Sequence, residues 1–270
     1  MKGLELENVD LTYNRGRVDE VRALRGLSLE VEQGEFLTIV GSNGAGKSST
    51  VQIVSGSARP TCGRVMIDGK DVSRKPDYRR AGLVARVFDD PRMGSAPELS
   101  IEDNLALAFS RGSRRRLRWA SGPKRRAVMR EGLAALGLGL EHRLHDPVGL
   151  LSAGQRQSLT MVMAGLTAPR ILLLDEHLAA LDPSTARRVL DLTVGLASDL
   201  GCTTLMVTHN MDHALELGNR MLVMGGGRII ADIDQQAKSR LDVAGVIALI
   251  VSSGGVVSDR SLLPQTEMSA

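Results

Sequence analysis

The sequence predicts an α/β fold in which an N-terminal antiparallel sheet precedes a parallel core, with a helical lobe inserted into that core. Apolar and polar residues alternate between Leu4 and Glu32, which is the period of half-exposed antiparallel strands. A continuous apolar run at residues 36–40 feeds a glycine-rich turn, as a buried parallel strand does. Between about residues 91 and 169 the apolar residues take helical spacing instead.

Turn signals separate the next elements. The helix that follows the glycine-rich turn is expected to start near Gly46 and to run to Gly56. A hairpin is expected around Asp68-Gly69, because this dipeptide strongly favours a tight turn between two strands. Residues 84–88 are then expected to form another strand.

The helical lobe has an apolar face formed by Ile101, Leu105, Ala108 and Phe109. We expect the helical pattern to continue over residues 128–140 and a further helix to start at residues 151–155. The core then resumes with apolar strands at residues 171–174, 205–207 and 221–224, and the last turns through three glycines into residues 228–230. The expected organisation is one domain over residues 1–230 with the lobe at about 91–169, and a partly disordered extension at 231–270.

Length and composition limit the class of protein. A chain of 270 residues accommodates one α/β domain with an inserted lobe, and it is too short for two such domains in tandem. The apolar run at residues 243–251 has about half the length of a membrane span, and the acidic N-terminus is unlike a signal peptide. Cys62 and Cys202 lack metal-ligand spacing, fit a reducing cytosol, and are each expected to be small buried hydrophobes.

Basic residues are concentrated between Asn104 and Glu131, where no acidic residue occurs. The nine are Arg111, Arg114, Arg115, Arg116, Arg118, Lys124, Arg125, Arg126 and Arg130, and without them the acidic residues of the chain outnumber the basic ones. The pattern fits a solvated loop, or contact with anionic lipid head groups or an acidic partner. Nucleic acid is the least favoured partner, because Trp119 is the only aromatic residue among these basic ones.

The clearest motif is the run Gly41-Ser42-Asn43-Gly44-Ala45-Gly46-Lys47-Ser48, between an expected strand and an expected helix. Glycines in such a loop let backbone N–H groups point into one concavity, and the helix N-terminus adds partial positive charge. This context identifies a phosphate-binding loop of a nucleotide site. Lys47 is expected to bridge the β- and γ-phosphates, and the Ser48 hydroxyl to bind Mg²⁺.

Two adjacent carboxylates follow the strand expected at residues 171–174. Ligands of α/β folds bind at the C-terminal edge of the parallel strands, so Asp175 is expected beside the phosphates as a partner of Mg²⁺. Glu176, one residue on, is expected to polarise the attacking water as a general base. A single histidine, His209, ends the strand expected near residues 205–207.

The segment Leu151-Ser152-Ala153-Gly154-Gln155 lies upstream of the two carboxylates. With these motifs in this order, the chain resembles the ATP-binding cassette (ABC) family of transporter ATPases over roughly residues 4–230. The resemblance implies a RecA-like P-loop NTPase core with the antiparallel sheet and inserted helical lobe described above. It also implies a head-to-tail dimer that encloses two ATP molecules.

The resemblance further implies roles for individual residues. The subunit that holds the ATP is expected to contact it through Tyr13, Gly41, Ser42, Asn43, Gly44, Ala45, Gly46, Lys47, Ser48 and Ser49. The partner subunit is expected to add Ser152, Ala153, Gly154, Gln155 and Asp182. Mg²⁺ is expected at Ser48, Asp89 and Asp175, while catalysis is assigned to Glu176, His209 and Lys47, with His209 on the γ-phosphate. Two alternatives stay open, namely Tyr13 as an ordinary strand tyrosine and Asp182 as a helix cap.

Two positions depart from the family pattern. Asp89 stands where relatives usually have glutamine, so it keeps an oxygen ligand but adds negative charge beside the γ-phosphate and loses an amide donor. We hypothesise that Asp89 slows hydrolysis or tightens its Mg²⁺ dependence. Ala153 stands where many relatives have glycine, and its methyl group is expected to be tolerated unless the position needs a positive φ.

The predicted function is therefore ATP hydrolysis that powers a membrane transporter, with import favoured. Expected partners are a second cassette, transmembrane permease subunits and an extracytoplasmic substrate-binding protein, at the cytoplasmic face of the inner membrane. The alternatives are an export subunit, a soluble cassette protein acting on nucleic acid or ribosomes, and an ATP-binding switch with poor hydrolysis. The transported substrate is not written in this chain, because specificity in this family resides in other subunits.

Overall fold

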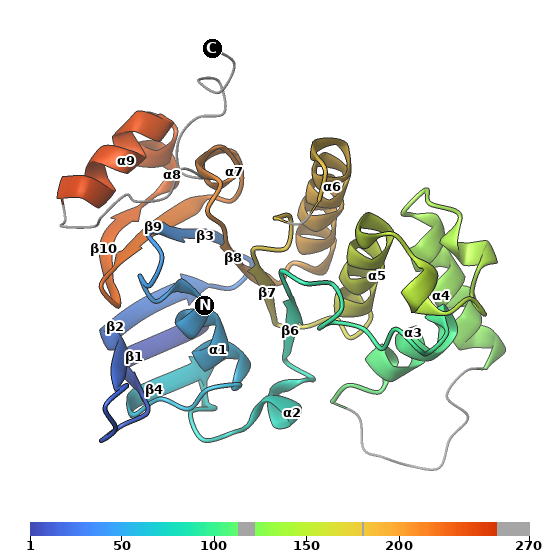
Figure 1. Ribbon diagram of the computed structural model, residues 1–270, viewed down its shortest axis with the longest axis horizontal. Coiled ribbons are helices and arrows are strands. Elements are labelled where there is room, and N and C mark those ends of the chain that lie inside the picture. The colour runs from blue at the N-terminus through green and yellow to red at the C-terminus, as the bar shows by residue number, and fades with distance from the viewer. Residues whose placement is uncertain (113–121, 180, 253–270) are drawn as a thin grey trace. The chain divides into compact units, whose positions relative to one another are not determined.

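The computed structural model describes residues 1–112, 122–179 and 181–252. The chain forms two compact units, one of residues 1–77 with 203–270 and the other of residues 78–202 (Figure 1). Of the extension predicted at residues 231–270, residues 231–252 are described and residues 253–270 are not; the middle of the basic stretch, with Trp119, also lies outside the described residues.

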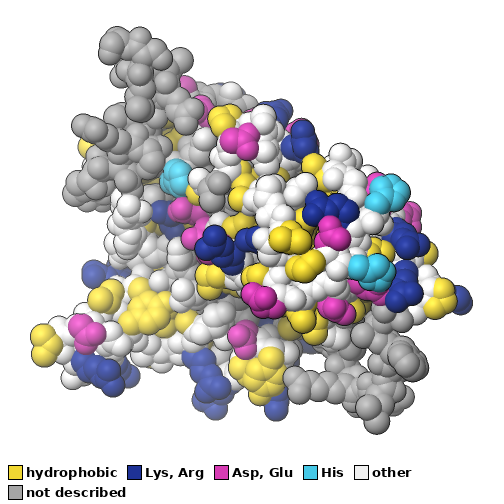
Figure 2. Space-filling view, turned by 45° about the vertical axis from the view of Figure 1, so that its right-hand side comes forward, with side chains coloured by type: hydrophobic (Ala, Val, Ile, Leu, Met, Phe, Trp, Pro, Cys, Tyr) yellow, Lys and Arg dark blue, Asp and Glu magenta, His cyan; other side chains and the backbone are white. Residues whose placement is uncertain are grey.

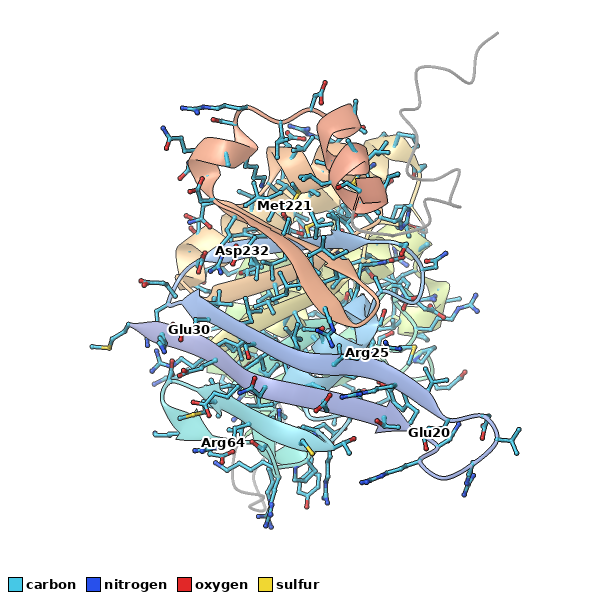
Figure 3. All side chains as sticks on the ribbon, turned by 90° about the vertical axis from the view of Figure 1, so that its left-hand side faces the viewer. Glu20, Arg25, Glu30, Arg64, Met221 and Asp232 are labelled. Atoms are coloured by element: carbon cyan, nitrogen blue, oxygen red, sulfur yellow. The ribbon has the colours of Figure 1, made fainter. Side chains whose placement is uncertain are left out.

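The first unit contains the predicted antiparallel sheet, in the order β2-β1-β4-β5 (Figure 3). Its strands are β1 (Lys2–Tyr13), β2 (Val21–Glu32), β4 (Cys62–Ile67) and β5 (Lys70–Asp71). Leu4 and Leu6 are buried and pair with Val31 and Leu29 of β2, so the alternation predicted from the sequence sets this register. The Asp68-Gly69 hairpin is confirmed, because both residues have a positive φ between β4 and β5.

The parallel strands of the first unit form its second layer. Strand β3 (Phe36–Gly41) pairs in parallel with β8 (Thr203–Val207) on one side and β9 (Arg220–Gly225) on the other, and β10 (Arg228–Ile233) returns antiparallel to β9. Because β3 is paired on both sides, its side chains are almost all buried, which explains its continuous apolar run.

Short helices complete the first unit. They are α1 (Lys47–Ser55), α7 (Met211–Glu216), α8 (Gln235–Lys238) and α9 (Val243–Ser252). Helix α9 buries Val246 and Ile250 in a cluster with Val40, Met211 and Val223, so this apolar run serves packing. None of the described helices combines the length and the apolar character that a bilayer crossing requires.

The second unit combines a strand pair with the helical lobe. Strands β6 (Val84–Val87) and β7 (Ile171–Asp175) pair in parallel from Val84↔Ile171 to Val87↔Leu174. The helices are α3 (Ile101–Phe109), α4 (Pro123–Ala134), α5 (Ala153–Gly165) and α6 (Pro183–Leu200), with a short α2 (Asp77–Arg80) at the unit's start and 3₁₀ turns η1 (Leu140–His142) and η2 (Val148–Leu150).

The predicted apolar face of the lobe is buried, because Ile101, Leu105 and Ala108 lie in its core and Phe109 packs against them. The helix predicted over residues 128–140 is wrong in its bounds. It begins at Pro123, whose ring suits the first helical position, and it ends at Ala134. The next residues include Gly137 and Gly139 in left-handed conformations, which end the helical pattern.

The cysteine prediction is half correct. Cys202 is buried as expected, whereas Cys62 is exposed. Cys62 opens β4 opposite Asp10, next to a register shift between β1 and β4, and the first three residues of that strand face solvent. A strand end beside an irregular ladder leaves its side chains uncovered, which is why this small apolar residue is not buried.

Two of the described basic residues of the stretch make contacts within the lobe. Arg126 donates to Glu102 across 2.7 Å, and the guanidinium of Arg125 lies 5.7 Å from the centre of the Phe109 ring. Figure 2 shows Lys and Arg side chains interspersed with acidic and apolar ones over its visible face. The alternatives for the stretch therefore stay open, since Arg114, Arg115, Arg116 and Arg118 lie outside the described residues.

Candidate active site

The phosphate loop connects β3 to α1 in the first unit; conformation requires its three glycines, and space requires two of them. Gly41, Gly44 and Gly46 all have positive φ values. A Cβ atom on Gly41 would lie 2.2 Å from the Met224 carbonyl oxygen, and one on Gly46 would lie 2.9 Å from that of Ala23. Gly41 and Gly46 thus let neighbouring backbone approach the loop more closely than any side chain would allow.

Lys47 is the first residue of α1 and its side chain folds back over this loop. Its Nζ donates to the carbonyl oxygens of Gly41 at 2.8 Å and Ser42 at 3.2 Å, and the residue is buried. Ser48 is exposed, whereas Ser49 and Ala45 are less accessible. The ammonium group is thus held at the loop by neutral acceptors, which an anionic phosphate can replace with a stronger charge-assisted bond.

Tyr13 ends β1 and is tied to the helix that follows the phosphate loop. Its hydroxyl donates to Gln52 Oε1 at 2.7 Å and lies 3.4 Å from Ser49 Oγ. The ring is half-buried, so one part of it is accessible. This contact fixes the tyrosine beside the phosphate-loop helix, and stacking on adenine stays a prediction.

His209 follows β8, the parallel neighbour of β3. Because Ile39 and Val207 are register partners, Gly41 and His209 each lie two residues beyond the same level of the sheet. The structure therefore places His209 and the phosphate loop at one C-terminal edge, where α/β folds bind ligands.

The acidic residues belong to the second unit and meet at the C-terminal edge of its strand pair. Val87 is the register partner of Leu174, so Asp89 and Glu176 each lie two residues further on. Asp89 is exposed, Glu176 is half-buried and Asp175 is buried. Glu176 also has a φ of 47°, a left-handed conformation that is rare for a residue with a side chain and costs of the order of 1 kcal/mol.

Asp175 has a partner that the sequence reasoning missed. Arg86 Nη2 donates to Asp175 Oδ2 at 2.6 Å, and the guanidinium also lies 4.5 Å from the centre of the Phe88 ring. Burial raises the pKa of Asp175, the ion pair with Arg86 opposes that rise, and the negative charges of Asp89 and Glu176 add to it. The available signal was a single arginine within an otherwise apolar strand.

Ser152 caps the N-terminus of α5 in a complete capping box. Its Oγ accepts from the Gln155 backbone N–H at 3.2 Å, and Gln155 Oε1 accepts from the Ser152 N–H at 3.1 Å. Ala153 is the first helical residue and is not among the described residues with positive φ, so its methyl group fits. Gly154 is different, because a Cβ there would lie 2.2 Å from Thr185 Cγ2 of α6.

Asp182 caps the N-terminus of α6, as the helix-cap alternative predicted. Its Oδ1 accepts from the Thr185 backbone N–H at 3.1 Å and from the Ser184 hydroxyl at 2.6 Å. These bonds hold the pKa of Asp182 well below its usual range. Its predicted role across a dimer stays a prediction, and Ala180 of the same loop lies outside the described residues.

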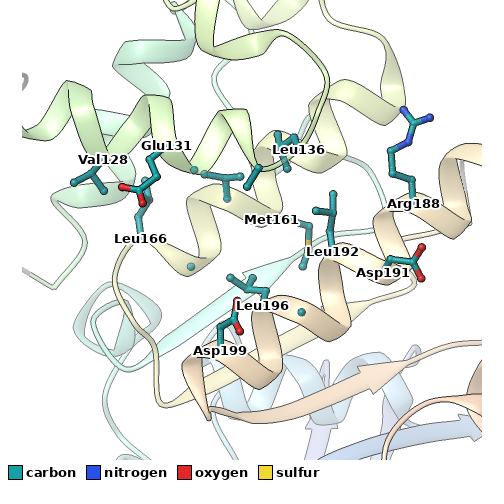
Figure 4. A pocket seen from close by; sticks show the side chains of 15 residues that line it. Val128, Glu131, Leu136, Met161, Leu166, Arg188, Asp191, Leu192, Leu196 and Asp199 are labelled. Atoms are coloured by element: carbon teal, nitrogen blue, oxygen red, sulfur yellow. The ribbon is translucent and has the colours of Figure 1, made fainter.

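A separate apolar groove of about 710 Å³ lies between α4, α5 and α6 (Figure 4). Its lining includes Leu136, Met161, Leu192 and Leu196, with Asp199 at its edge. None of the predicted site residues lines it, so this groove is not the nucleotide site.

A strand, a glycine loop and a helix that opens with lysine define a phosphate-binding-loop NTPase. Comparison with known proteins specifies the class further, because the ABC transporter family model matches residues 24–179. The chain belongs to the ABC transporter family, as the motifs predicted.

Two curated relatives illustrate the similarity. The chain is 36% identical to a tyrosine transport ATP-binding protein of Clostridioides difficile, over 90% of this chain and 97% of that protein. It is 38% identical to the energy-coupling factor transporter ATP-binding protein EcfA2 of Symbiobacterium thermophilum, over 83% and 75% of the two chains.

Solved structures agree with the fold. A dimeric ATP-binding cassette in a post-hydrolysis state, bound to ADP and Pi, matches with a TM-score of 0.74 and 28% identity over 86% of this chain and 98% of that one. A nucleotide-free ATP-binding cassette matches with a TM-score of 0.75 at 24% identity, over 94% and 99%, which shows the fold alone. The α/β cassette fold and the assignment as an ATP-binding, ATP-hydrolysing transporter subunit are thereby confirmed.

Proposed function

We propose that this ATPase drives the uptake of a small solute of the amino-acid class, together with membrane permease subunits and an extracytoplasmic binding protein. The observation that carries the ATPase part is the phosphate loop, in which three glycines have a positive φ, two of them leave no room for a Cβ atom, and Lys47 folds over the loop carbonyls. The substrate class is supported by the similarity to the tyrosine transport protein, which extends over nearly the whole of that relative.

Three residues have separate roles in the proposed hydrolysis. Lys47 exchanges its carbonyl acceptors for the β- and γ-phosphates and stabilises their negative charge. Glu176 accepts a proton from the attacking water as that water approaches the γ-phosphorus, and His209 holds the γ-phosphate oxygens by a hydrogen bond. The proton therefore moves from water to the Glu176 carboxylate. The water oxygen bonds to the γ-phosphorus, and the bond from that phosphorus to the bridging oxygen of ADP breaks.

The donor set fits Mg²⁺. Ser48, Asp89 and Asp175 offer hydroxyl and carboxylate oxygens, which are the ligands that this hard cation prefers. When bound, Mg²⁺ neutralises charge on the phosphates. Arg86 holds the Asp175 carboxylate in place and ionised beside this position, despite the burial that raises its pKa.

A second copy of the cassette is proposed to complete each site. The N-terminus of α5, with Ser152 and Gly154, presents backbone N–H groups that suit the γ-phosphate of an ATP held by the partner copy. The dimeric ADP- and Pi-bound relative supports this arrangement. The assembly is proposed to lie at the cytoplasmic face of the membrane, bound to its permease.

The first experiment is to tag the chain, purify it from solubilised membranes of its host, and identify stoichiometric partners by mass spectrometry. A permease and a binding protein are expected, and uptake of radiolabelled tyrosine by the same cells should stop in the Glu176→Gln variant. Glu131→Gln, the same chemical change on exposed α4, is the control and should leave uptake intact. Recovery with ribosomes or nucleic acid would overturn the transport assignment, and a permease without uptake of any amino acid would overturn the substrate class.

A further inference from the structure

Gln157 is a fully buried residue of α5 whose side chain joins two loops of the second unit. Its Nε2 donates to the carbonyl oxygen of Phe88 at 3.1 Å and to that of His177 at 2.8 Å. Phe88 directly precedes Asp89, and His177 directly follows Glu176. One amide group therefore holds the backbone beside both of the carboxylates that follow β6 and β7.

These two bonds begin where the strand pairing ends. The ladder between β6 and β7 stops at Val87↔Leu174, so the carbonyls further along both strands need other donors. Gln157 supplies one N–H to each of them. Its own Oε1, however, is buried with no hydrogen-bond partner among the described residues. A buried unsatisfied oxygen costs of the order of 1–3 kcal/mol, so stability alone does not account for this glutamine.

His177 has a second anchor through its ring. The Nε2 atom lies 3.0 Å from Thr193 Oγ1 of α6, and both side chains are buried. Because the Thr193 hydroxyl donates to the Val189 carbonyl at 2.7 Å, its oxygen accepts from the ring, which sets the tautomer with the proton on Nε2. His177 is thus fixed by its backbone to α5 and by its ring to α6.

The residue between these fixed points is Glu176, which has the strained φ of 47°. Strained backbone of this kind persists only where the surroundings determine it, and it is frequent at active sites. On one side Asp175 is held in β7 and by Arg86, and on the other side His177 has the two anchors described above. The anchors therefore fix the backbone from which the Glu176 side chain projects.

We propose that Gln157 is a positioning residue for ATP hydrolysis, which ties helix α5 to the Glu176 turn and to the Asp89 loop. Ser152, at the start of α5, lies five residues from Gln157 on the same helix, a distance over which a helix moves as a rigid rod. A displacement of the Ser152 end therefore reaches Glu176 through one buried amide. The proposal rests on the hydrolytic function above and adds the route by which helix α5 acts on Glu176, the proposed general base.

The test is the Gln157→Met variant, which keeps the volume and removes both donors. Its kcat should fall by roughly tenfold to a hundredfold, since a shift of about 1 Å in a reacting group has an effect of that size. Its dissociation constant for ATP, measured with a fluorescent analogue, should stay within about twofold. Thr160→Val is the matched control, because Thr160 is buried on the same helix and, within the described part of the chain, its hydroxyl bonds to the Gln157 backbone carbonyl of that helix. Its kcat should stay at the wild-type value.

A purely structural role predicts different results. In the Glu176→Gln background, single-turnover hydrolysis of radiolabelled ATP with excess enzyme should show no further loss when Gln157→Met is added. An additional loss of the same size, or an unchanged kcat in Gln157→Met alone, overturns the proposal while the wild-type activity still supports the function. If Gln157→Met does not fold, Thr193→Val carries the test, with a smaller fall in kcat that again vanishes in the Glu176→Gln background. Absence of hydrolysis by the wild-type assembly would instead reject the proposed function itself.

Discussion

The guanidinium Nη2 of Arg86 lies 2.6 Å from Oδ2 of Asp175, and both side chains are largely shielded from solvent. The pair joins neighbouring strands, because Arg86 lies on β6 and Asp175 ends β7. A buried carboxylate beside Asp89 and Glu176 would otherwise be driven toward its protonated form. Arg86 therefore opposes the rise in the pKa of Asp175 and fixes the orientation of its carboxylate at the end of β7.

Replacement of Arg86 by methionine should destabilise the protein by about 3 kcal/mol near neutral pH, because it leaves a buried carboxylate unpaired. The pKa of Asp175 in the folded state would rise further above the unfolded value of 3.8. The folded state then binds more protons than the unfolded state between these two pKa values, so stability falls as pH rises through that window. Urea unfolding should accordingly show a smaller deficit at about pH 5 than at about pH 7.

A suitable control is Arg143→Met, which breaks the more exposed pair with Asp146. The cost there should stay below about 1 kcal/mol at both pH values. Equal deficits of Arg86→Met at the two pH values would contradict the role given to Arg86.

Gly154→Ala should destabilise the protein by about 1–3 kcal/mol, since the new methyl group would meet Thr185 Cγ2 at 2.2 Å. The second change Thr185→Ser removes that Cγ2 atom and should restore most of the loss. The adjacent Ala153→Gly serves as the control, with a change of under about 1 kcal/mol, because Ala153 already has helical geometry. Thermal unfolding of the wild type and these three variants checks the clash, and a double mutant no more stable than Gly154→Ala would refute it.

The phosphate loop and the helix cap could be predicted from the sequence, whereas the side chains that hold the catalytic carboxylates in place could not. The phosphate loop and the Ser152 cap depend on neighbouring residues, so their patterns are complete within a few positions. Arg86 and Gln157 act on partners 89 and 69 residues away, which only the folded strand pair brings near. The predicted end of the helical pattern near residue 140 is wrong for a local reason, because Gly137 and Gly139 adopt positive φ values that stop the helix.

The burial of Lys238 should make the stability of the protein depend on pH. It is buried on α8 and donates to the carbonyl oxygens of Leu217 and Gly218, and burial lowers its pKa from 10.5 to about 8. Between these values the unfolded chain holds a proton that the folded chain lacks, so the free energy of unfolding rises with pH, by up to about 3 kcal/mol. Lys238→Met should lack this rise. The free energy of unfolding is measured by urea denaturation between about pH 8 and pH 10. If it rises equally with pH in the wild type and in Lys238→Met, Lys238 is not the cause of the rise.

Glu176→Gln should bind ATP as tightly as the wild type and release almost no phosphate, because the amide keeps the shape but cannot take the proton from water. Binding is measured with a fluorescent ATP analogue and turnover by phosphate release. Asp175→Asn, one residue earlier, gives a contrasting comparison. It should change ATP binding too, by making that binding less dependent on Mg²⁺. Continued turnover in Glu176→Gln would move the general base to another residue.

Asp89→Gln tests the departure from the family pattern. Removal of this exposed negative charge lowers the repulsion on Asp175 and, in the proposed nucleotide site, on the γ-phosphate, and the amide adds a donor. Turnover should rise by a few-fold, and less Mg²⁺ should be needed for the half-maximal rate. Each change corresponds to about 1 kcal/mol or less, as expected for the removal of an exposed charge. Asp90→Asn, which removes the next exposed charge, is the control and should change neither quantity. Equal turnover of Asp89→Gln and wild type at every Mg²⁺ concentration would show that Asp89 does what a glutamine does.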